Sequence, residues 1–171
     1  MIMTISNFFT EDQAKFFRAY CGYASNNDSS EVSLVTGKKT KKVDRNYYTL
    51  RSHYKFMDEI KQLSENEFGN ELYYQKRVFG HIMHYHTPGQ GLEWHAEPNI
   101  ATVSVSINLS KDHEYEGAEF QIKDEQIHLP YKAAVFYASN RMHRVTPLKS
   151  GQKKSLVMWL QNKEQRKCAD S

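Results

Sequence analysis

The stretch that decides the fold lies between residues 102 and 109 and reads Thr102-Val103-Ser104-Val105-Ser106-Ile107-Asn108-Leu109. Apolar side chains alternate with polar ones throughout this stretch. Because successive side chains point to opposite faces of a strand, the alternation predicts a half-buried β-strand. Further short apolar runs that read as strands cover Phe120–Ile122, Ala133–Tyr137 and Ser155–Leu160. Turn-like segments around Gly117 and Pro130 separate these runs, and such spacing is typical of a β-sandwich or barrel.

Helical patterns come before the strands. Thr10, with Gln13 three residues later, is a helix-start signal of the capping-box type. The apolar positions expected on one face of this helix are Ala14, Phe17, Cys21 and Ala24. A second amphipathic helix is predicted from Tyr54 through Phe68, ended by Gly69. The sequence therefore predicts one α+β domain, mainly β, with a double-sheet barrel and supporting N-terminal helices.

Length and composition exclude several classes of protein. The 171 residues suit a single domain, and an aromatic share of 13% argues against a disordered chain. The net charge of +3 argues neither for nor against nucleic acid. Two cysteines, Cys21 and Cys168, exclude a disulfide framework and a CxxC metal site. No apolar run is long enough for a membrane span, and Met1–Thr4 does not begin a secretory leader, so we expect a cytoplasmic protein.

Histidine and carboxylate spacing carries the expected chemistry. His95 and Glu97 are two residues apart, so on a strand both side chains would lie on one face. His143 follows the run Ala133–Tyr137 and is the best third ligand. Two histidines and one carboxylate form the ligand set of non-haem Fe(II) oxygenases, which keep other coordination positions open. The chief competing ligands are His81, His84 and His86.

Two further residues could serve a ligand near this metal. Lys153 opens the run Ser155–Leu160 and could hold a dicarboxylate through charge-assisted hydrogen bonds, unless it is an exposed turn lysine. Tyr85 precedes the His95 segment and could offer a phenol, unless it is a core aromatic. The basic segment Val35–Tyr48 could close over a substrate.

An ordered set of motifs resembles the catalytic core of the 2-oxoglutarate/Fe(II)-dependent dioxygenases. The resemblance covers Val78 to Gln161 and is greatest to the prolyl 4-hydroxylase-like group, including the bacterial PKHD-type hydroxylases. The motifs are Tyr85 with Pro88-Gly89, His95-Ala96-Glu97, Tyr115-Glu116-Gly117-Ala118-Glu119-Phe120, Leu129-Pro130, Ala134-Val135-Phe136-Tyr137, His143-Arg144-Val145-Thr146-Pro147, Gly151-Gln152-Lys153 and Trp159-Leu160-Gln161.

The resemblance implies a double-stranded β-helix, which is a jelly-roll, cupin-like barrel. It implies one domain over residues 1–171, with helical support at 1–72, the catalytic barrel at 73–162 and a polar tail at 163–171. His95, Glu97 and His143 become the iron ligands, Lys153 the anchor for 2-oxoglutarate, and Tyr85 a neighbour of that cosubstrate. The family more often has Asp at the position of Glu97 and Arg at that of Lys153.

The implied reaction is hydroxylation of an unactivated C–H bond, with 2-oxoglutarate and O2 consumed and succinate and CO2 released. Ascorbate is an additional cofactor candidate. The family favours a protein or peptide side chain as substrate, with proline as the default, while small molecules stay open. A rival is oxidative demethylation of nucleic acid, with phosphates contacted by Lys38, Lys39, Lys41 and Lys42. A second rival is a jelly-roll binding module without catalysis.

Overall fold

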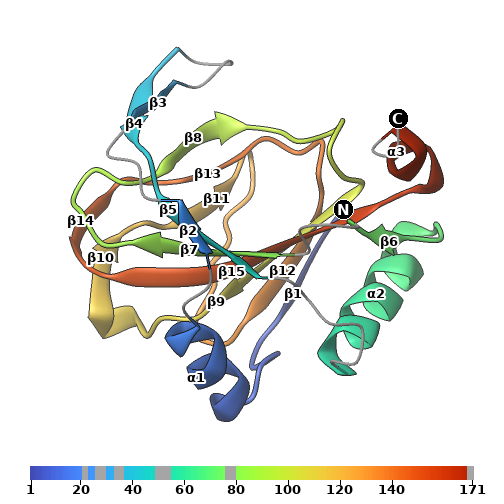
Figure 1. Cartoon of the computed structure of the whole chain (residues 1–171), viewed down its shortest axis with the longest axis horizontal. Helices are drawn as coiled ribbons and strands as arrows, with labels where there is room; N and C mark the ends of the chain where they lie inside the picture. Colours follow the sequence, from blue (N-terminus) through green and yellow to red (C-terminus); the bar gives the residue numbers. More distant parts are fainter. Residues whose placement is uncertain (21–22, 26–29, 33–36, 49–54, 76–79, 169–171) are drawn as a thin grey trace.

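A large antiparallel sheet organises the molecule. The computed structural model describes residues 1–20, 23–25, 30–32, 37–48, 55–75 and 80–168 (Figure 1). The strands of the large sheet, in spatial order, are β1 (Ile2–Ile5), β12 (Ala134–Ala138), β9 (Val103–Asn108), β15 (Lys153–Gln161), β7 (Gly80–Tyr85), β5 (Asp44–Tyr48) and β2 (Tyr23–Ser25), with β6 (Tyr73–Tyr74) paired to the end of β15. The chain is therefore mainly β.

Smaller sheets complete the fold. One contains β11 (Phe120–Ile122), β13 (His143–Val145) and β8 (Leu92–His95), in that order. The others are the pair β10 (Tyr115–Gly117) with β14 (Leu148–Gly151) and the pair β3 (Ser30–Val32) with β4 (Lys39–Lys41). A short 3-10 helix, Asp112–Glu114, precedes β10. Figure 1 shows β8 and β13 on the side of the large sheet opposite to the helix α1.

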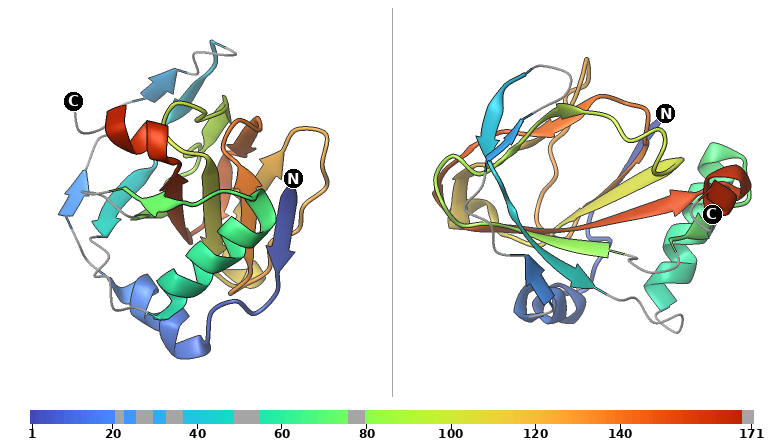
Figure 2. Two further views of the ribbon diagram at one scale, coloured as in Figure 1. Left: turned by 90° about the vertical axis from the view of Figure 1, so that its right-hand side faces the viewer. Right: turned by 45° about the horizontal axis from the view of Figure 1, so that its top comes forward.

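Helices α1 and α2 pack on the outer face of the large sheet. Helix α1 (Glu11–Ala19) begins with the expected capping box between Thr10 and Gln13, and α2 is Lys55–Phe68. The rings that join these helices to the core are Phe9, Phe17 and Phe56, with centroids 5.3–5.5 Å apart. A third helix, α3 (Lys163–Cys168), lies at the same end of the molecule as α2 (Figure 2). None of the described helices is long and apolar enough to cross a membrane.

Strand β9 separates the core from the interior of the molecule. Val103, Val105 and Ile107 belong to the apolar core beneath the helices, whereas Ser104 and Ser106 point to the opposite face. All six residues of β9 are buried, so the expectation of a half-buried strand was wrong. The polar face lies against the smaller sheets and lines an internal cavity, which removes it from solvent.

The N-terminal region contributes more than helices. Strands β1, β2 and β5 extend the large sheet at both of its edges, so residues 1–72 hold strands as well as the expected helical support. The first helix ends at Ala19, which leaves Ala24 in β2 and not on the helical face where it was expected. Cys21 lies outside the described residues. The polar tail begins with α3, so its first part is ordered as a helix.

Two glycines allow a test of the packing between β10 and β14. Gly151 has φ +75°, and a Cβ atom there would lie 2.1 Å from the carbonyl oxygen of Glu114. Gly69 has a similar φ of +72°, with no heavy atom within 4 Å of the same position. We expect Gly151→Ala to lower the free energy of unfolding by about 3 kcal/mol or more, and Gly69→Ala by about 1 kcal/mol. Urea unfolding measures both, and equal losses would contradict the close approach of the backbone at Gly151.

Candidate metal centre

Strand pairing brings two histidines together. His95 ends β8 and His143 begins β13, and these residues are direct partners in the antiparallel register. Their ring centroids are 4.2 Å apart. The side chain of His143 is 6% exposed and that of His95 is 30% exposed, so the pair lies at the wall of a cavity with one ring deep and one nearer the opening.

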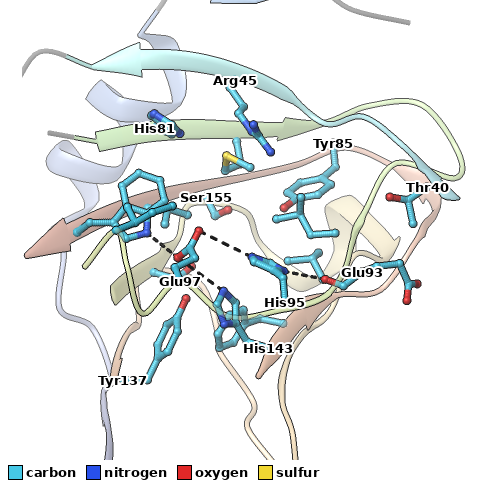
Figure 3. Close-up of a pocket in the computed structure, with 18 of the residues that line it drawn as sticks. Thr40, Arg45, His81, Tyr85, Glu93, His95, Glu97, Tyr137, His143 and Ser155 are labelled. Atoms are coloured by element: carbon cyan, nitrogen blue, oxygen red, sulfur yellow. Dashed lines mark hydrogen bonds and ion pairs between the residues drawn. The ribbon is translucent and has the colours of Figure 1, made fainter. Parts of the chain in front are cut away.

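Glu97 joins this pair from a turn. The strand β8 ends at His95, so the expectation that one strand would present both His95 and Glu97 was wrong. The Glu97 amide donates to the carbonyl of Ser139 over 2.7 Å, and the Glu97 carbonyl accepts from the amides of Ile100 and Ala101. These bonds fix the backbone of Glu97 so that its side chain turns inward toward both imidazoles (Figure 3).

The three side chains converge on one point. Glu97 Oε1 lies 3.9 Å from His95 Nε2, and Glu97 Oε2 lies 4.0 Å from His143 Nε2. One donor atom from each residue falls within 4.8 Å of the others. These distances are too long for hydrogen bonds, and a small inward movement of the side chains would bring the three donors to the distance of about 2.0–2.2 Å at which each binds a shared ion. The group could therefore hold a metal ion.

The protonation state of the histidines also fits a metal. His95 Nδ1 lies 2.7 Å from the carbonyl oxygen of Glu93, and His143 Nδ1 lies 2.9 Å from that of Arg141. A carbonyl only accepts, so each Nδ1 must carry the proton and each Nε2 offers a lone pair to the centre. Burial, together with the neighbouring His95 ring, lowers the pKa of His143 to about 4, which keeps this imidazole neutral at pH 7.

A cavity of about 410 Å³ opens onto the three donors. The large sheet supplies one wall and the smaller sheet with β8 and β13 supplies another (Figure 3). Tyr85 lines the cavity and is 1% exposed, in agreement with either of its expected roles. Ser106, Ser155 and Trp159 line it from the polar faces of β9 and β15. The volume leaves room for small organic ligands beside a metal.

Lys153 is buried next to this cavity but lines a different one. Its ammonium donates to the carbonyl oxygen of Ala118 over 2.6 Å and lies 4.9 Å from the centroid of the Tyr115 ring. It borders a second cavity of about 420 Å³, which shares Phe120 with the first. Lys153 is 4% exposed, so it is not an exposed turn lysine. Within the described residues, no carboxylate lies within salt-bridge distance of its Nζ.

The competing histidines lie elsewhere. His84 Nε2 is 3.1 Å from Gln152 Oε1, and His86 Nε2 is paired with Asp44. His81 lines the first cavity, but its ring packs edge-on against Trp159, with centroids 4.7 Å apart. Burial and the charge of Arg45 lower the pKa of His81 to about 4. Among the described residues, only His95, Glu97 and His143 form a group that could bind a metal.

The structure describes only residues 37–48 of the segment Val35–Tyr48. Residues 33–36 lie outside the described residues. Residues 39–41 form β4, which pairs with β3 as a hairpin strand, and residues 44–48 form β5. Thr40 of β4 lines the first cavity, while Lys39 and Lys41 on either side are exposed.

Curated relatives share part of the sequence. A PKHD-type hydroxylase of Hyphomonas neptunium is 38% identical over 64 residues, which is 35% of this chain and 29% of that protein. A PKHD-type hydroxylase of Psychrobacter is 33% identical over 89 residues, which is 43% of this chain and 34% of that protein. The resemblance to these hydroxylases is confirmed. The match spans about a third of the length of each relative, and no protein-family model matches the chain.

Solved structures share the fold over nearly the whole chain. The viral collagen prolyl hydroxylase of Paramecium Bursaria Chlorella virus-1 matches with a TM-score of 0.63 and 12% identity, covering 94% of this chain and 95% of that one. A 2OG-Fe(II) oxygenase family protein of Burkholderia pseudomallei matches with a TM-score of 0.66 and 12% identity, covering 96% and 88%. The chain therefore has the fold of these oxygenases.

Burial of Lys153 predicts how stability depends on pH. Desolvation lowers the pKa of Lys153 from 10.5 to about 8, while Glu119 and Asp112 oppose this shift. Below about pH 8 the Lys153 ammonium is charged in both the folded and the unfolded protein. Between about pH 8 and pH 10.5 it is neutral in the folded protein but still protonated in the unfolded chain, so the unfolded chain binds more protons at this site. The stability of the protein relative to Lys153→Met should therefore rise with pH across this window. Urea unfolding of both proteins at pH 7 and pH 10 measures the change.

The exposed Lys149 provides a matched control for this measurement. Lys149 lies on β14 and its side chain is 70% exposed. Lys149→Met therefore makes the same change of residue and of charge as Lys153→Met, but at a solvated ammonium. We expect its effect on stability to change much less between the two pH values. A Lys153→Met effect that does not vary with pH would show that the ammonium is solvated.

Proposed function

We propose that this chain is a 2-oxoglutarate- and Fe(II)-dependent dioxygenase that hydroxylates an unactivated C–H bond, with release of succinate and CO2. Its substrate is a protein or peptide side chain such as proline. The single observation that carries the proposal is the convergence of two imidazoles and one carboxylate at the wall of a cavity. The similarity to PKHD-type hydroxylases and the shared fold support it.

The proposed ligands are His95, Glu97 and His143. Two nitrogens and one oxygen suit Fe(II), and donors on one side of the ion leave positions free for small ligands. Iron and 2-oxoglutarate, when bound, supply the activation of O2 that attack on an unactivated C–H bond requires. The chain's own contribution is to fix the donors, orient the substrate and exclude water from the cavity.

Lys153 is the proposed partner of the distal carboxylate of 2-oxoglutarate. It projects from the same face of β15 as Ser155 and Val157, which line the first cavity. Among the described residues no carboxylate lies within salt-bridge distance of its Nζ, and Glu119 and Asp112 act on it only from farther away, so an incoming dicarboxylate would supply the direct ion pair. Tyr85 is the direct partner of Lys153 in the pairing of β7 with β15 and would lie beside the same cosubstrate.

The proposal extends to the architecture. The large sheet and the smaller sheet that carries β8 and β13 would be the two faces of a double-stranded β-helix. The catalytic barrel would span residues 73–162, within a single domain of residues 1–171. Strands β1, β2 and β5 would then be additions to the large face of the barrel.

Nucleic acid is the second candidate substrate. The observation in its favour is the position of Thr40 at the first cavity, between the exposed Lys39 and Lys41. Mass spectrometry after incubation with peptide pools and with methylated oligonucleotides separates the two. A peptide product heavier by one oxygen atom supports the first candidate, and loss of a methyl group from the oligonucleotide supports the second.

The metal ligands predict the first activity test. With Fe(II), 2-oxoglutarate and ascorbate to keep the iron reduced, the purified protein should form succinate. Glu97→Ala removes the only anionic ligand, so we expect Fe(II) affinity to fall by more than about a hundredfold and succinate formation to stop. His84→Ala is the matched control, because His84 contacts Gln152 outside the cavity. Anaerobic Fe(II) titration and a succinate assay measure these effects. Succinate formation by Glu97→Ala at the rate of the parent would contradict the proposed site.

Neighbouring lysines on β15 predict the second test. Lys153 is buried, whereas Lys154 Nζ donates to the Arg18 carbonyl at the end of α1, on the opposite face. Lys153→Ala should raise the 2-oxoglutarate requirement by two or more orders of magnitude, since breaking a buried ion pair costs about 3–5 kcal/mol. Iron affinity should not change, which also checks that the variant is folded. If Lys154→Ala is the damaging change, the distal carboxylate binds elsewhere.

A further inference from the structure

Glu97 has a second set of contacts that its expected ligand role does not require. The indole Nε1 of Trp159 donates to Glu97 Oε2 over 2.7 Å, and the Ser104 hydroxyl lies 3.4 Å from the same oxygen. Among the described residues no hydrogen-bond donor to Glu97 Oε1 is found, and this oxygen lies 3.9 Å from His95 Nε2. Each oxygen of the carboxylate faces one imidazole, Oε1 that of His95 and Oε2 that of His143, but only Oε2 is also held by the large sheet (Figure 3).

The indole is itself held rigidly. Trp159 lies in β15, directly opposite Ser104 of β9, and is 9% exposed. Its ring packs edge-on against His81 of β7. The hydroxyls of Ser104 and Ser139 are 2.8 Å apart, and the Ser139 carbonyl accepts the Glu97 amide. Both the backbone and the carboxylate of Glu97 are thus tied to one buried polar network.

The length of Glu97 makes this anchoring necessary. Glutamate has one more methylene than aspartate and one more rotatable bond, so an unrestrained side chain would lose more entropy when it binds a metal. A hydrogen bond from a buried indole removes that freedom in advance. A charged acceptor strengthens the bond, because hydrogen bonds to ionised groups are shorter and stronger than neutral ones.

We infer that Trp159 is a positioning residue that holds Glu97 Oε2, so that Glu97 presents Oε1 to the metal together with His95 and His143. The inference rests on the proposed ligand role of Glu97. It assigns a role to Trp159, which the sequence motifs include without a role. It also implies that Asp at position 97 cannot replace Glu, because the shorter side chain cannot both keep the bond to Trp159 and reach the metal.

Metal affinity of Trp159→Phe tests the inference without any need for activity. Phenylalanine keeps a ring against His81 but removes the N–H donor. Calorimetric titration with Co(II) should show binding about 10–100-fold weaker than in the parent, the usual cost of losing a hydrogen bond to a metal ligand. Trp94→Phe is the matched control: Trp94 neighbours His95 in sequence, but its ring lies under the Arg144 guanidinium, 4.7 Å from its centroid. This control should bind Co(II) as the parent does.

A double-mutant cycle shows whether Trp159 acts through Glu97. In the Glu97→Ala background, Trp159→Phe should cause no further loss of Co(II) affinity, since the carboxylate it positions is absent. An equal loss in both backgrounds would overturn the inference and assign Trp159 a general packing role. Glu97→Asp should bind Co(II) as weakly as Trp159→Phe does, and parent-like affinity of Glu97→Asp would overturn the length argument.

Failure of the proposed function gives a different result. If the parent does not bind Co(II) or Fe(II), or if Glu97→Ala binds as tightly as the parent, the ligand set is wrong and the inference falls with it. If Glu97→Ala binds Co(II) weakly but Trp159→Phe binds it as tightly as the parent, the ligand set stands and only the inference fails.

The Trp94→Phe protein keeps one tryptophan, so its fluorescence reports on Trp159. Titration with Co(II) should change the Trp159 emission with a midpoint equal to that measured by calorimetry. If the emission is unchanged when the site is saturated with Co(II), the inference is overturned without the need for a Trp159 variant.

Discussion

The division of side chains between the two faces of β9 and β15 is the constraint on which the core and the cavity both depend. On one face the apolar core is formed by Val103, Val105 and Ile107 of β9 and Leu156, Met158 and Leu160 of β15. On the other face the cavity is lined by Ser106 of β9 and by Ser155, Val157 and Trp159 of β15. Because the side-chain period of a strand is two, a register slip by one residue would exchange these sets. The Val–Ser repeat of β9 therefore fixes the position of the cavity and the stability of the core at the same time.

The donor group is assembled from three different kinds of local structure. His95 is placed by the end of a strand, His143 by the start of its partner strand, and Glu97 by a turn held to Ser139. The two backbone carbonyls that accept from the Nδ1 atoms orient the imidazoles before any ion arrives. Such preorganisation lowers the entropy lost on binding, because the rings need not be ordered at that moment.

Local patterns predicted the two N-terminal helices, four of the strands and the grouping of His95, Glu97 and His143. Strand β11, helix α2 and the capping box of α1 agree with the sequence patterns, and the order of His95, Glu97 and His143 along the chain indicated one metal group. Other features depend on tertiary contacts that no local pattern reports. Strands β1, β2 and β5 are short additions to sheet edges, and their pairing comes from distant segments. The bond between Trp159 and Glu97 joins residues 62 positions apart, although the alternation along β15 could have placed Trp159 on the same face as Lys153.

The balance of charge links the buried lysine to the donor group. Glu97 and Lys153 carry opposite charges, and burial lowers the pKa of Lys153. Further charged side chains line the two cavities, with Arg45 and Glu93 at the first and Asp112, Glu116 and Glu119 at the second. With the proposed occupants, a divalent cation would add two positive charges and a dicarboxylate two negative ones. The four groups together would be neutral, which is the arrangement that a poorly solvated site tolerates at least cost. Adding either occupant alone would bring in two charges that the other occupant would offset, so each should bind better in the presence of the other. In the proposed arrangement the charge of Lys153 would complement that of the cosubstrate, and the charge of Glu97 that of the metal.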